Sequence, residues 1–348
     1  MSDNNNPESE PELEAAPAPV EINEEAPGFD VLDEADASNQ VATAQNYQVL
    51  ARKYRPNNFT DLIGQQAMVQ TLTHAFESGR IAHAFMLTGV RGVGKTTTAR
   101  ILARALNYQS DTINAPTTML ETEGVHCRQI MDGTHVDVIE MDAASHTGID
   151  DIREIIQNVP YAPAAARNKV YIIDEVHMLS KGAFNGLLKT LEEPPDHVKF
   201  IFATTELRKV PVTVLSRCQR FDLRRLTHDD TLQLLTKTCA AEKVFVPEEA
   251  LSLIARAGDG SARDALSLLD RALAHGEGDE AMNADTMRRL LGLADRGRIF
   301  DLFDKLMGGQ LTDALVEFDE QYRLGADPIM ILADLAELTH WLTRLKFV

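Results

Sequence analysis

One short glycine-rich and basic segment constrains the fold of this chain more than any other feature. Residues 89–96 read GVRGVGKT, which fits the pattern G-x-x-x-x-G-K-[ST], and they lie between an apolar run and a helical pattern. Glycines there let successive backbone N–H groups converge on phosphate oxygens, and the following helix points its positive end at the anion. The pattern predicts a phosphate-binding loop that joins a strand to a helix. The residues expected to line it are Gly89, Val90, Arg91, Gly92, Val93, Gly94, Lys95, Thr96 and Thr97.

Two adjacent carboxylates follow a second apolar run, where residues 169–175 read KVYIIDE. Alone, such a pair is often part of a solvated loop, but its combination with a phosphate loop favours a functional site. We expect Lys95 to reach the β- and γ-phosphates, and the Thr96 hydroxyl and Asp174 to hold Mg²⁺. Glu175 is then placed to polarise the attacking water.

A hydroxyl pair and an arginine extend the candidate set. Thr204 and Thr205 end the strand-like run FIFATT, where a hydroxyl can contact a γ-phosphate or the attacking water. The plainer interpretation is that β-branched residues simply favour a strand end. Arg217 precedes the last strand-like run in the sequence SRC, and by itself it would be an ordinary surface charge.

A second arginine lies in an unfavourable electrostatic position. Ser261 and Asp264 resemble a capping box at a helix start, which places Arg263 in the first helical turn. The helix dipole disfavours a cation there by a few tenths of a kcal/mol. Arg263 in this position suggests a nearby anion.

Strand-like runs alternate with helical stretches from residue 47 to about residue 225. The runs cover residues 84–88, 136–141, 170–173, 198–203 and 220–223. This alternation predicts a mainly parallel sheet with helices on both faces, an α/β architecture. After residue 225 only helical periodicity remains, and a further helical block starts near residue 286.

Charge and composition limit the partners and the compartment. The net charge is −19, and the first fifty residues hold 12 of the acidic side chains and no Lys or Arg, so residues 1–46 are predicted to be an acidic, disordered tail. The remaining residues carry 41 acidic and 34 basic side chains, whereas proteins that bind duplex DNA alone are usually strongly basic. The three cysteines are too scattered for a disulfide framework, and the sequence has no apolar run of ~18 residues and no signal peptide. We therefore predict a cytoplasmic protein without a membrane segment.

Several longer strings point to one family. They are YQVLARKYRP at 47–56, IGQ at 63–65, MDAAS at 141–145, DEVHML at 174–179, LLKTLEEPP at 187–195 and SRC at 216–218. In these strings and in the phosphate loop, residues 47–348 resemble the gamma/tau subunits of the bacterial DNA polymerase III clamp loader, which are AAA+ ATPases. Several of the strings are specific to this family and are not shared by phosphate-loop proteins at large.

The resemblance implies an AAA+ P-loop NTPase fold and a motor function. It implies an αβα nucleotide-binding domain at 47–225, a helical lid at 226–285 and part of a helical collar for oligomerisation at 286–348. Such a subunit binds ATP and Mg²⁺ and joins other subunits in a hetero-pentameric ring. The ring opens the sliding clamp and places it on primed DNA, which stimulates ATP hydrolysis. The chain ends within an apolar pattern, so we expect the collar to continue, with a C-terminal part that contacts the polymerase core. No polymerase active site is apparent.

The resemblance also assigns roles. It makes Asp174 and Glu175 the Walker B pair and Thr205 the γ-phosphate sensor, with Thr204 as the less favoured choice. Arg263 becomes a second sensor that reaches the nucleotide of its own subunit. The remaining residues are Arg217, as an arginine finger supplied to the neighbouring subunit, and Val49 and Ile63, as contacts of the adenine.

The chain departs from the family at one place. Members usually carry four cysteines at zinc-ligand spacing after the phosphate-loop helix, whereas here Tyr108 stands at the first cysteine position and only Cys127 remains. A tetrahedral site needs four ligands, and His126 with Cys127 supplies two at most. We therefore predict no zinc, a module held by packing, and a mobile loop at about 108–124.

Two other functions remain open from the sequence. A different AAA+ remodeller, such as a branch-migration motor, would share the phosphate loop, but the Ser-Arg-Cys and Glu-Pro-Pro strings argue against it. A catalytically silent scaffold subunit of the same ring would lack the reacting groups, but Lys95, Asp174 and Glu175 are intact.

Overall fold

The computed structural model describes residues 47–146, 148–275, 284–291 and 296–347. The predicted acidic tail at 1–46 lies outside the described residues. In the described part of the chain, no helix is long and apolar enough to cross a membrane.

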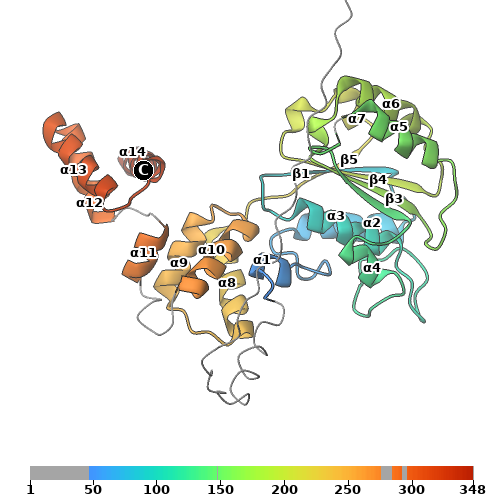
Figure 1. The fold of residues 1–348 in the computed structure, drawn as a ribbon, viewed down its shortest axis with the longest axis horizontal. Coiled ribbons are helices and arrows are strands. Elements are labelled where there is room, and N and C mark those ends of the chain that lie inside the picture. The colour runs from blue at the N-terminus through green and yellow to red at the C-terminus, as the bar shows by residue number, and fades with distance from the viewer. Residues whose placement is uncertain (1–46, 147, 276–283, 292–295, 348) are drawn as a thin grey trace, which may run out of the picture. The chain divides into compact units, whose positions relative to one another are not determined.

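A parallel five-stranded sheet forms the centre of the first half of the chain (Figure 1). Its strands run in the order β2-β3-β4-β1-β5 and all four pairings are parallel. Their bounds are β1 Ala84–Thr88, β2 Val138–Asp142, β3 Lys169–Asp174, β4 Val198–Thr204 and β5 Gln219–Asp222. The five predicted runs are confirmed to within two residues at each end. The strands are continuously apolar because a parallel sheet is covered by helices on both faces.

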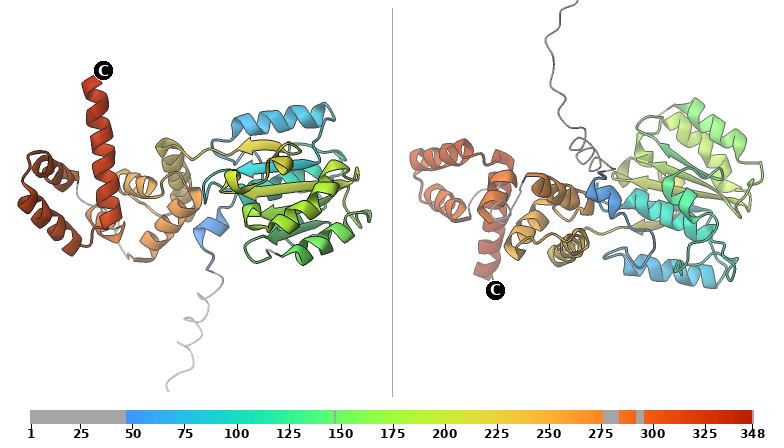
Figure 2. Two further views of the ribbon diagram at one scale, coloured as in Figure 1. Left: turned by 90° about the horizontal axis from the view of Figure 1, so that it is seen from above. Right: turned by 60° about the horizontal axis from the view of Figure 1, so that its bottom comes forward.

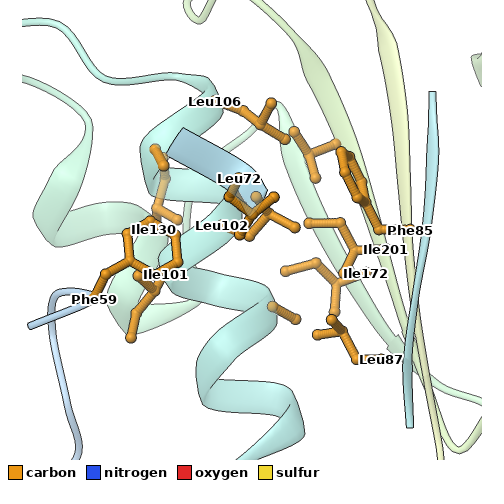
Figure 3. Close-up of a cluster of buried hydrophobic side chains, with 14 of the residues drawn as sticks. Phe59, Leu72, Phe85, Leu87, Ile101, Leu102, Leu106, Ile130, Ile172 and Ile201 are labelled. Carbon is orange, nitrogen blue, oxygen red and sulfur yellow. The ribbon is translucent and has the colours of Figure 1, made fainter. Parts of the chain in front are cut away.

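Helices cover both faces of this sheet (Figure 2). One face carries α2 Gln66–Glu77, α3 Lys95–Leu106 and α4 Cys127–Asp132, and the other carries α5 Ile149–Asn158, α6 Lys181–Glu192 and α7 Val212–Leu215. Successive strand residues alternate between the two layers: Phe85 and Leu87 join the first cluster, and Ala84 and Met86 the second. Figure 3 shows the first cluster, in which Leu102 and Leu106 of α3 pack against strand residues. Two 3₁₀ helices, η1 Val176–Met178 and η2 Leu207–Lys209, follow β3 and β4.

A separate helical cluster follows β5. It is built by α8 His228–Glu242, α9 Glu248–Ala257, α10 Ala262–His275 and α11 Ala284–Leu291. The apolar sets that the sequence predicts, including Leu251 and Ile254 of α9 and Leu266 and Leu269 of α10, are buried together. The first described helix, α1 Leu50–Lys53, also belongs to this cluster through the buried Leu50. The N-terminal segment therefore packs on the lid helices, although it precedes the sheet in sequence.

The last described helices are α12 Arg296–Met307, α13 Leu311–Arg323 and α14 Pro328–Phe347. They share a small core of their own, with Ile299, Leu302, Ala314, Ile331 and Leu338 buried. Other apolar side chains of the same helices are exposed, namely Phe300, Met307, Leu311, Leu315, Ile329 and Leu332. In the described residues beyond β5 there are helices and no strands, as predicted.

Candidate phosphate-binding and hydrolysis site

The glycine-rich loop has the backbone conformation that its sequence predicts. It leaves β1 at Thr88 and enters α3 at Lys95, with Gly94 as the helix N-cap at φ 96°. Gly92 has φ 79°, which also lies in the left-handed region that residues with a Cβ rarely adopt. The N-terminal N–H groups of α3 are without intrahelical partners, so this helix end can accept an anion.

A close contact with the segment that begins α10 also requires glycine at position 92, because a side chain would not fit there. A Cβ added at Gly92 would lie 1.9 Å from Ser261 Oγ, and the Arg263 backbone N–H donates to Gly92 O at 3.2 Å. Ser261 caps α10, because its hydroxyl accepts from the Asp264 N–H at 3.1 Å. The lid helix that carries Arg263 therefore begins directly on the phosphate loop. The sequence predicted the cap but gave no sign of the contact with Gly92.

Lys95 is buried beneath the loop. Its side chain is only 6% exposed, and its Nζ donates to Gly89 O and Val90 O, each at 3.2 Å. Burial lowers the pKa of Lys95 below its ordinary value, and the carboxylates of Glu175 and Asp174 act in the opposite direction. Lys95 donates to neutral carbonyl oxygens, so its ammonium keeps its charge for a phosphate oxygen at the loop.

The two residues expected to hold Mg²⁺ are in direct contact. The Thr96 hydroxyl donates to Asp174 Oδ2, and Asp174 Oδ1 accepts from the Glu175 N–H at 2.9 Å. A hydroxyl beside a carboxylate is the oxygen donor set that Mg²⁺ prefers, so these residues fit that ion.

Glu175 contacts the end of the neighbouring strand β4. Its Oε2 accepts from the backbone N–H and the hydroxyl of Thr205, at 3.3 and 3.1 Å. Glu175 has φ 45° and ψ 44°, a left-handed conformation that costs a residue with a Cβ on the order of 1–3 kcal/mol. Such backbone strain is concentrated at functional sites. Strand β4 lies between β3 and β1, and this order brings Thr205 to the same edge as the phosphate loop and the carboxylates of Asp174 and Glu175.

From the sequence alone, His177 of the string DEVHML is expected to be structural, whereas the structure places it among the site residues. Its Nδ1 lies 3.0 Å from Thr204 Oγ1 and 3.4 Å from Glu175 Oε2. Its Nε2 lies 3.4 Å from Glu206 Oε1. The only signal in the sequence was its spacing, two residues after the second acid.

Arg217 is not brought to the other site residues. Its guanidinium donates to Glu192 Oε1 and to Thr213 O, both at 2.6 Å, and its side chain is 32% exposed. Glu192 belongs to the LLKTLEEPP string, which explains why this string and SRC occur together. The neighbouring Cys218 is half-buried, and burial raises the pKa of its thiol to about 12, which disfavours the reactive thiolate.

Arg263 is exposed, and in the described residues no carboxylate pairs with its guanidinium. Burial, followed by the charges of Arg100, Arg263 and Arg52, lowers the pKa of Arg55, while Glu140 opposes the shift. The charges of Arg55 and Arg263 therefore oppose each other. Sequence reasoning named Arg55 only as part of the string at 47–56.

The two residues predicted to contact adenine are both accessible. Val49 precedes α1 and is 47% exposed, and Ile63 is partly buried. Gly64 and Gln65, which follow Ile63, are tied to Arg224: its Nε donates to Gly64 O at 2.8 Å and its carbonyl accepts from Gln65 Nε2 at 3.1 Å. The adenine contact stays a prediction.

A buried guanidinium organises the cysteine-poor module. Arg104 donates from Nε to Cys127 Sγ at 2.9 Å, and its other nitrogens reach the carbonyls of Asn57, Leu120 and Thr122. Tyr108, at the first expected cysteine position, is buried and packs in the same cluster.

Nearby, His126 Nδ1 and His135 Nε2 lie 2.9 Å apart, within hydrogen-bonding distance. Burial is the first cause that lowers the pKa of His135. Within the described residues no group of three or more His, Cys, Asp or Glu side chains could hold a metal ion. The expectation of no zinc, like that of a mobile loop, stays a prediction.

Three family profiles match the chain. Residues 64–227 match the DNA polymerase III delta subunit, residues 232–278 match the ATPase lid domain of the DNA polymerase III clamp loader subunit, and residues 282–348 match domain III of DNA polymerase III subunits gamma and tau.

The chain is also similar to whole proteins. It is 43% identical over 295 residues to the DNA polymerase III subunit tau of Escherichia coli strain K12, covering 85% of this chain and 45% of the relative. It is 40% identical over 301 residues to the DNA polymerase III subunit gamma of Buchnera aphidicola subsp. Schizaphis graminum, covering 86% of this chain and 81% of the relative. This chain therefore spans about half the length of the tau relative and most of the gamma relative.

Among solved structures, the Thermotoga maritima RuvB Holliday junction branch migration motor has a similar fold. The TM-score is 0.50 at 20% identity, covering 73% of this chain and 79% of that one. Together with the parallel sheet and the lid, this likeness shows the AAA+ fold.

Proposed function

The chain belongs to the family of DNA polymerase III gamma and tau subunits, and from that premise we propose that it is an ATP-hydrolysing motor subunit of a clamp loader. In this proposal, it opens a sliding clamp and loads it onto primed DNA during replication. One observation carries the proposal: Lys95, Thr96, Asp174, Glu175 and Thr205 converge at one edge of the sheet, where Thr96 is hydrogen-bonded to Asp174 and Thr205 to Glu175.

The residues divide the work of phosphoryl transfer to water. Backbone N–H groups of the loop and Lys95 bind the phosphates of ATP, and Thr96 and Asp174 would hold Mg²⁺, which neutralises charge on the phosphate oxygens when bound. Glu175 accepts a proton from the attacking water, and Thr205 orients that carboxylate and contacts the γ-phosphate. Arg263 reaches the same nucleotide from the lid, and its neighbour Arg55 supports this role.

A second subunit completes the proposed site. Arg217 has no contact with the phosphate loop of its own chain among the described residues, which supports a role at a neighbour's nucleotide. Arginine fingers of this kind contribute roughly 10³–10⁵ in rate. The exposed apolar side chains of α12–α14 support assembly through residues 286–348, the proposed collar, in a hetero-pentameric ring. Residues 47–225 and 226–285 form the proposed nucleotide and lid domains, and the polymerase core is a further proposed partner.

The test is ATP turnover by the full-length protein with its clamp, partner subunits and primed DNA. We expect slow turnover by the isolated subunit, and a large rise when all three components are added. The Glu175→Gln variant should keep nucleotide affinity and lose the rise. Turnover by the isolated subunit as fast as in the full assembly, or no turnover in either, would contradict the proposal.

The alternatives have weaker support. The likeness to the branch migration motor is one of fold alone, at 20% identity, whereas gamma and tau relatives reach 40–43%. A silent scaffold would not need Lys95 buried under an intact loop or a strained Glu175. Stimulation by Holliday junctions and not by primed DNA would favour the first, and nucleotide binding without hydrolysis in the ring would favour the second.

A further inference from the structure

His177 occupies a closed position between the proposed catalytic glutamate and the end of β4. Its side chain is 6% exposed, and it lies in η1, immediately after the Walker B pair. It contacts groups from both segments: Glu175 beside it in the chain, and Thr204 and Glu206 across the sheet edge. Neither phosphate binding nor metal binding uses this imidazole.

The two nitrogens of the His177 ring have different hydrogen-bonding partners. Thr204 Oγ1 accepts from the Glu206 N–H at 3.0 Å, so its own proton is free for another acceptor, or its second lone pair for another donor. Nδ1 of His177, at 3.0 Å, is the partner that the structure gives it. Nε2 faces only Glu206, at 3.4 Å, and Glu206 is held independently by Lys209 Nζ at 2.8 Å.

Nδ1 therefore faces the two groups that matter for hydrolysis. It lies beside Glu175 Oε2, the same oxygen that accepts both bonds from Thr205, and it joins the buried hydroxyl that ends β4. When Thr205 contacts a γ-phosphate, the Glu175 carboxylate loses or shares these bonds. The His177 imidazole, which is held by Thr204 of β4, would then keep the Glu175 carboxylate in place relative to the strand.

We propose that His177 is a positioning residue that, through Nδ1, couples the carboxylate of Glu175 to the end of β4 and so aligns it for attack by water. This inference rests on the proposed ATP hydrolysis. It adds a means by which a movement of β4, next to the proposed sensor Thr205, changes the position of the Glu175 carboxylate. A purely structural histidine would instead stabilise η1 and affect folding and nucleotide binding together.

Substitution of His177 by asparagine or glutamine distinguishes the roles of the two ring nitrogens. Asparagine places a nitrogen near the position of Nδ1, and glutamine places one near that of Nε2. We expect His177→Ala and His177→Gln to lower kcat by about 10-fold to 100-fold in the full loader with clamp and primed DNA, as for a misplaced catalytic group. His177→Asn should retain kcat within about threefold, because it keeps the contact with Thr204.

Binding and folding supply the discriminating readouts. KM for ATP, and the affinity for a fluorescent ATP analogue, should change less than about twofold in all three variants, because no phosphate contact is removed. Glu206→Gln is the matched control: it weakens the Nε2 contact and the ion pair with Lys209 but leaves Nδ1 and its partners in place, so kcat should stay near the wild-type value.

Four outcomes would overturn the inference. They are unchanged kcat in His177→Ala, a parallel loss of kcat and affinity in all three variants, rescue by Gln and not by Asn, and a Glu206→Gln loss equal to that of His177→Ala. Should His177→Ala fail to fold, the comparison of Asn with Gln still decides. A wild-type loader without turnover would instead overturn the proposed function, and an active wild type with an active His177→Ala overturns this inference alone.

Discussion

The carboxyl edge of the sheet and the segment that carries Arg217 differ in their contacts: the site residues at the edge bind one another, whereas in the described part of the chain Arg217 binds none of them. At the sheet edge, Thr96 is hydrogen-bonded to Asp174, and Thr205 to Glu175, so groups that follow β1, β3 and β4 meet within one chain. Arg217 is also held firmly, but by Glu192 and Thr213. This difference supports the proposal that one chain assembles the groups for binding and water activation and that Arg217 acts at a neighbouring subunit.

The broadest effect should come from Lys95→Ala, because it lowers binding and turnover together. This change removes the side-chain cation that the described residues place under the phosphate loop, so we expect ATP affinity to fall by at least ~100-fold, and turnover by more. Calorimetric titration of the purified protein measures it. Lys199→Ala is the matched control: Lys199 is equally buried, and burial lowers its pKa as well, but it lies on β4 away from the loop. Unchanged affinity in Lys95→Ala would refute the site.

Arg217→Ala should separate the two regions. ATP affinity of the single chain should stay within about twofold, whereas turnover in the complete ring with DNA should fall by roughly 10³-fold. Parallel nucleotide-binding and single-turnover measurements distinguish these. If binding and turnover fell together, Arg217 would have a role in folding and not in the neighbouring site.

The difference between the regions also explains what the sequence could predict. The strands and the phosphate loop were predictable because their signals are local: continuous apolar runs, glycines at fixed spacing and a following helix. The pairing of Thr205 with Glu175 depends on β4 lying between β3 and β1, which no local pattern encodes. The register of Thr88 with Thr204 then brings the end of β4 level with the start of the loop.

Contacts between segments far apart in sequence were hidden for the same reason. Ser261 could be identified as a helix cap, but its approach to Gly92 depends on the fold of the chain after β5. Leu50 appeared to belong with the sheet and is buried among lid helices. The guanidinium of Arg104 takes a central place among carbonyls and Cys127, where the family pattern had suggested only missing zinc ligands.

Glu192→Gln should have a smaller effect. Removing the charge of Glu192 weakens the ion pair with Arg217 at a partly exposed site, where such pairs contribute about 0.2–1 kcal/mol. We expect DNA-stimulated turnover in the ring to fall by about twofold to fivefold, with ATP affinity unchanged. The adjacent Glu193→Gln is the matched control and should be silent. A loss as deep as that of Arg217→Ala would mean that Glu192 itself takes part in the reaction.

The smallest effect should be a pH dependence of nucleotide affinity that belongs to the sheet edge alone. Burial lowers the pKa of Lys95 in the free protein, and a bound phosphate favours the ammonium form, so binding raises that pKa again. Affinity should then be highest below the free-protein pKa and should fall as the pH rises through it, by at most about tenfold per pH unit because one proton is involved. Titrations between neutral and alkaline pH measure this. Lys95→Arg keeps its charge throughout and should bind more weakly but with a flat profile; an equal slope in both proteins would show that another group titrates.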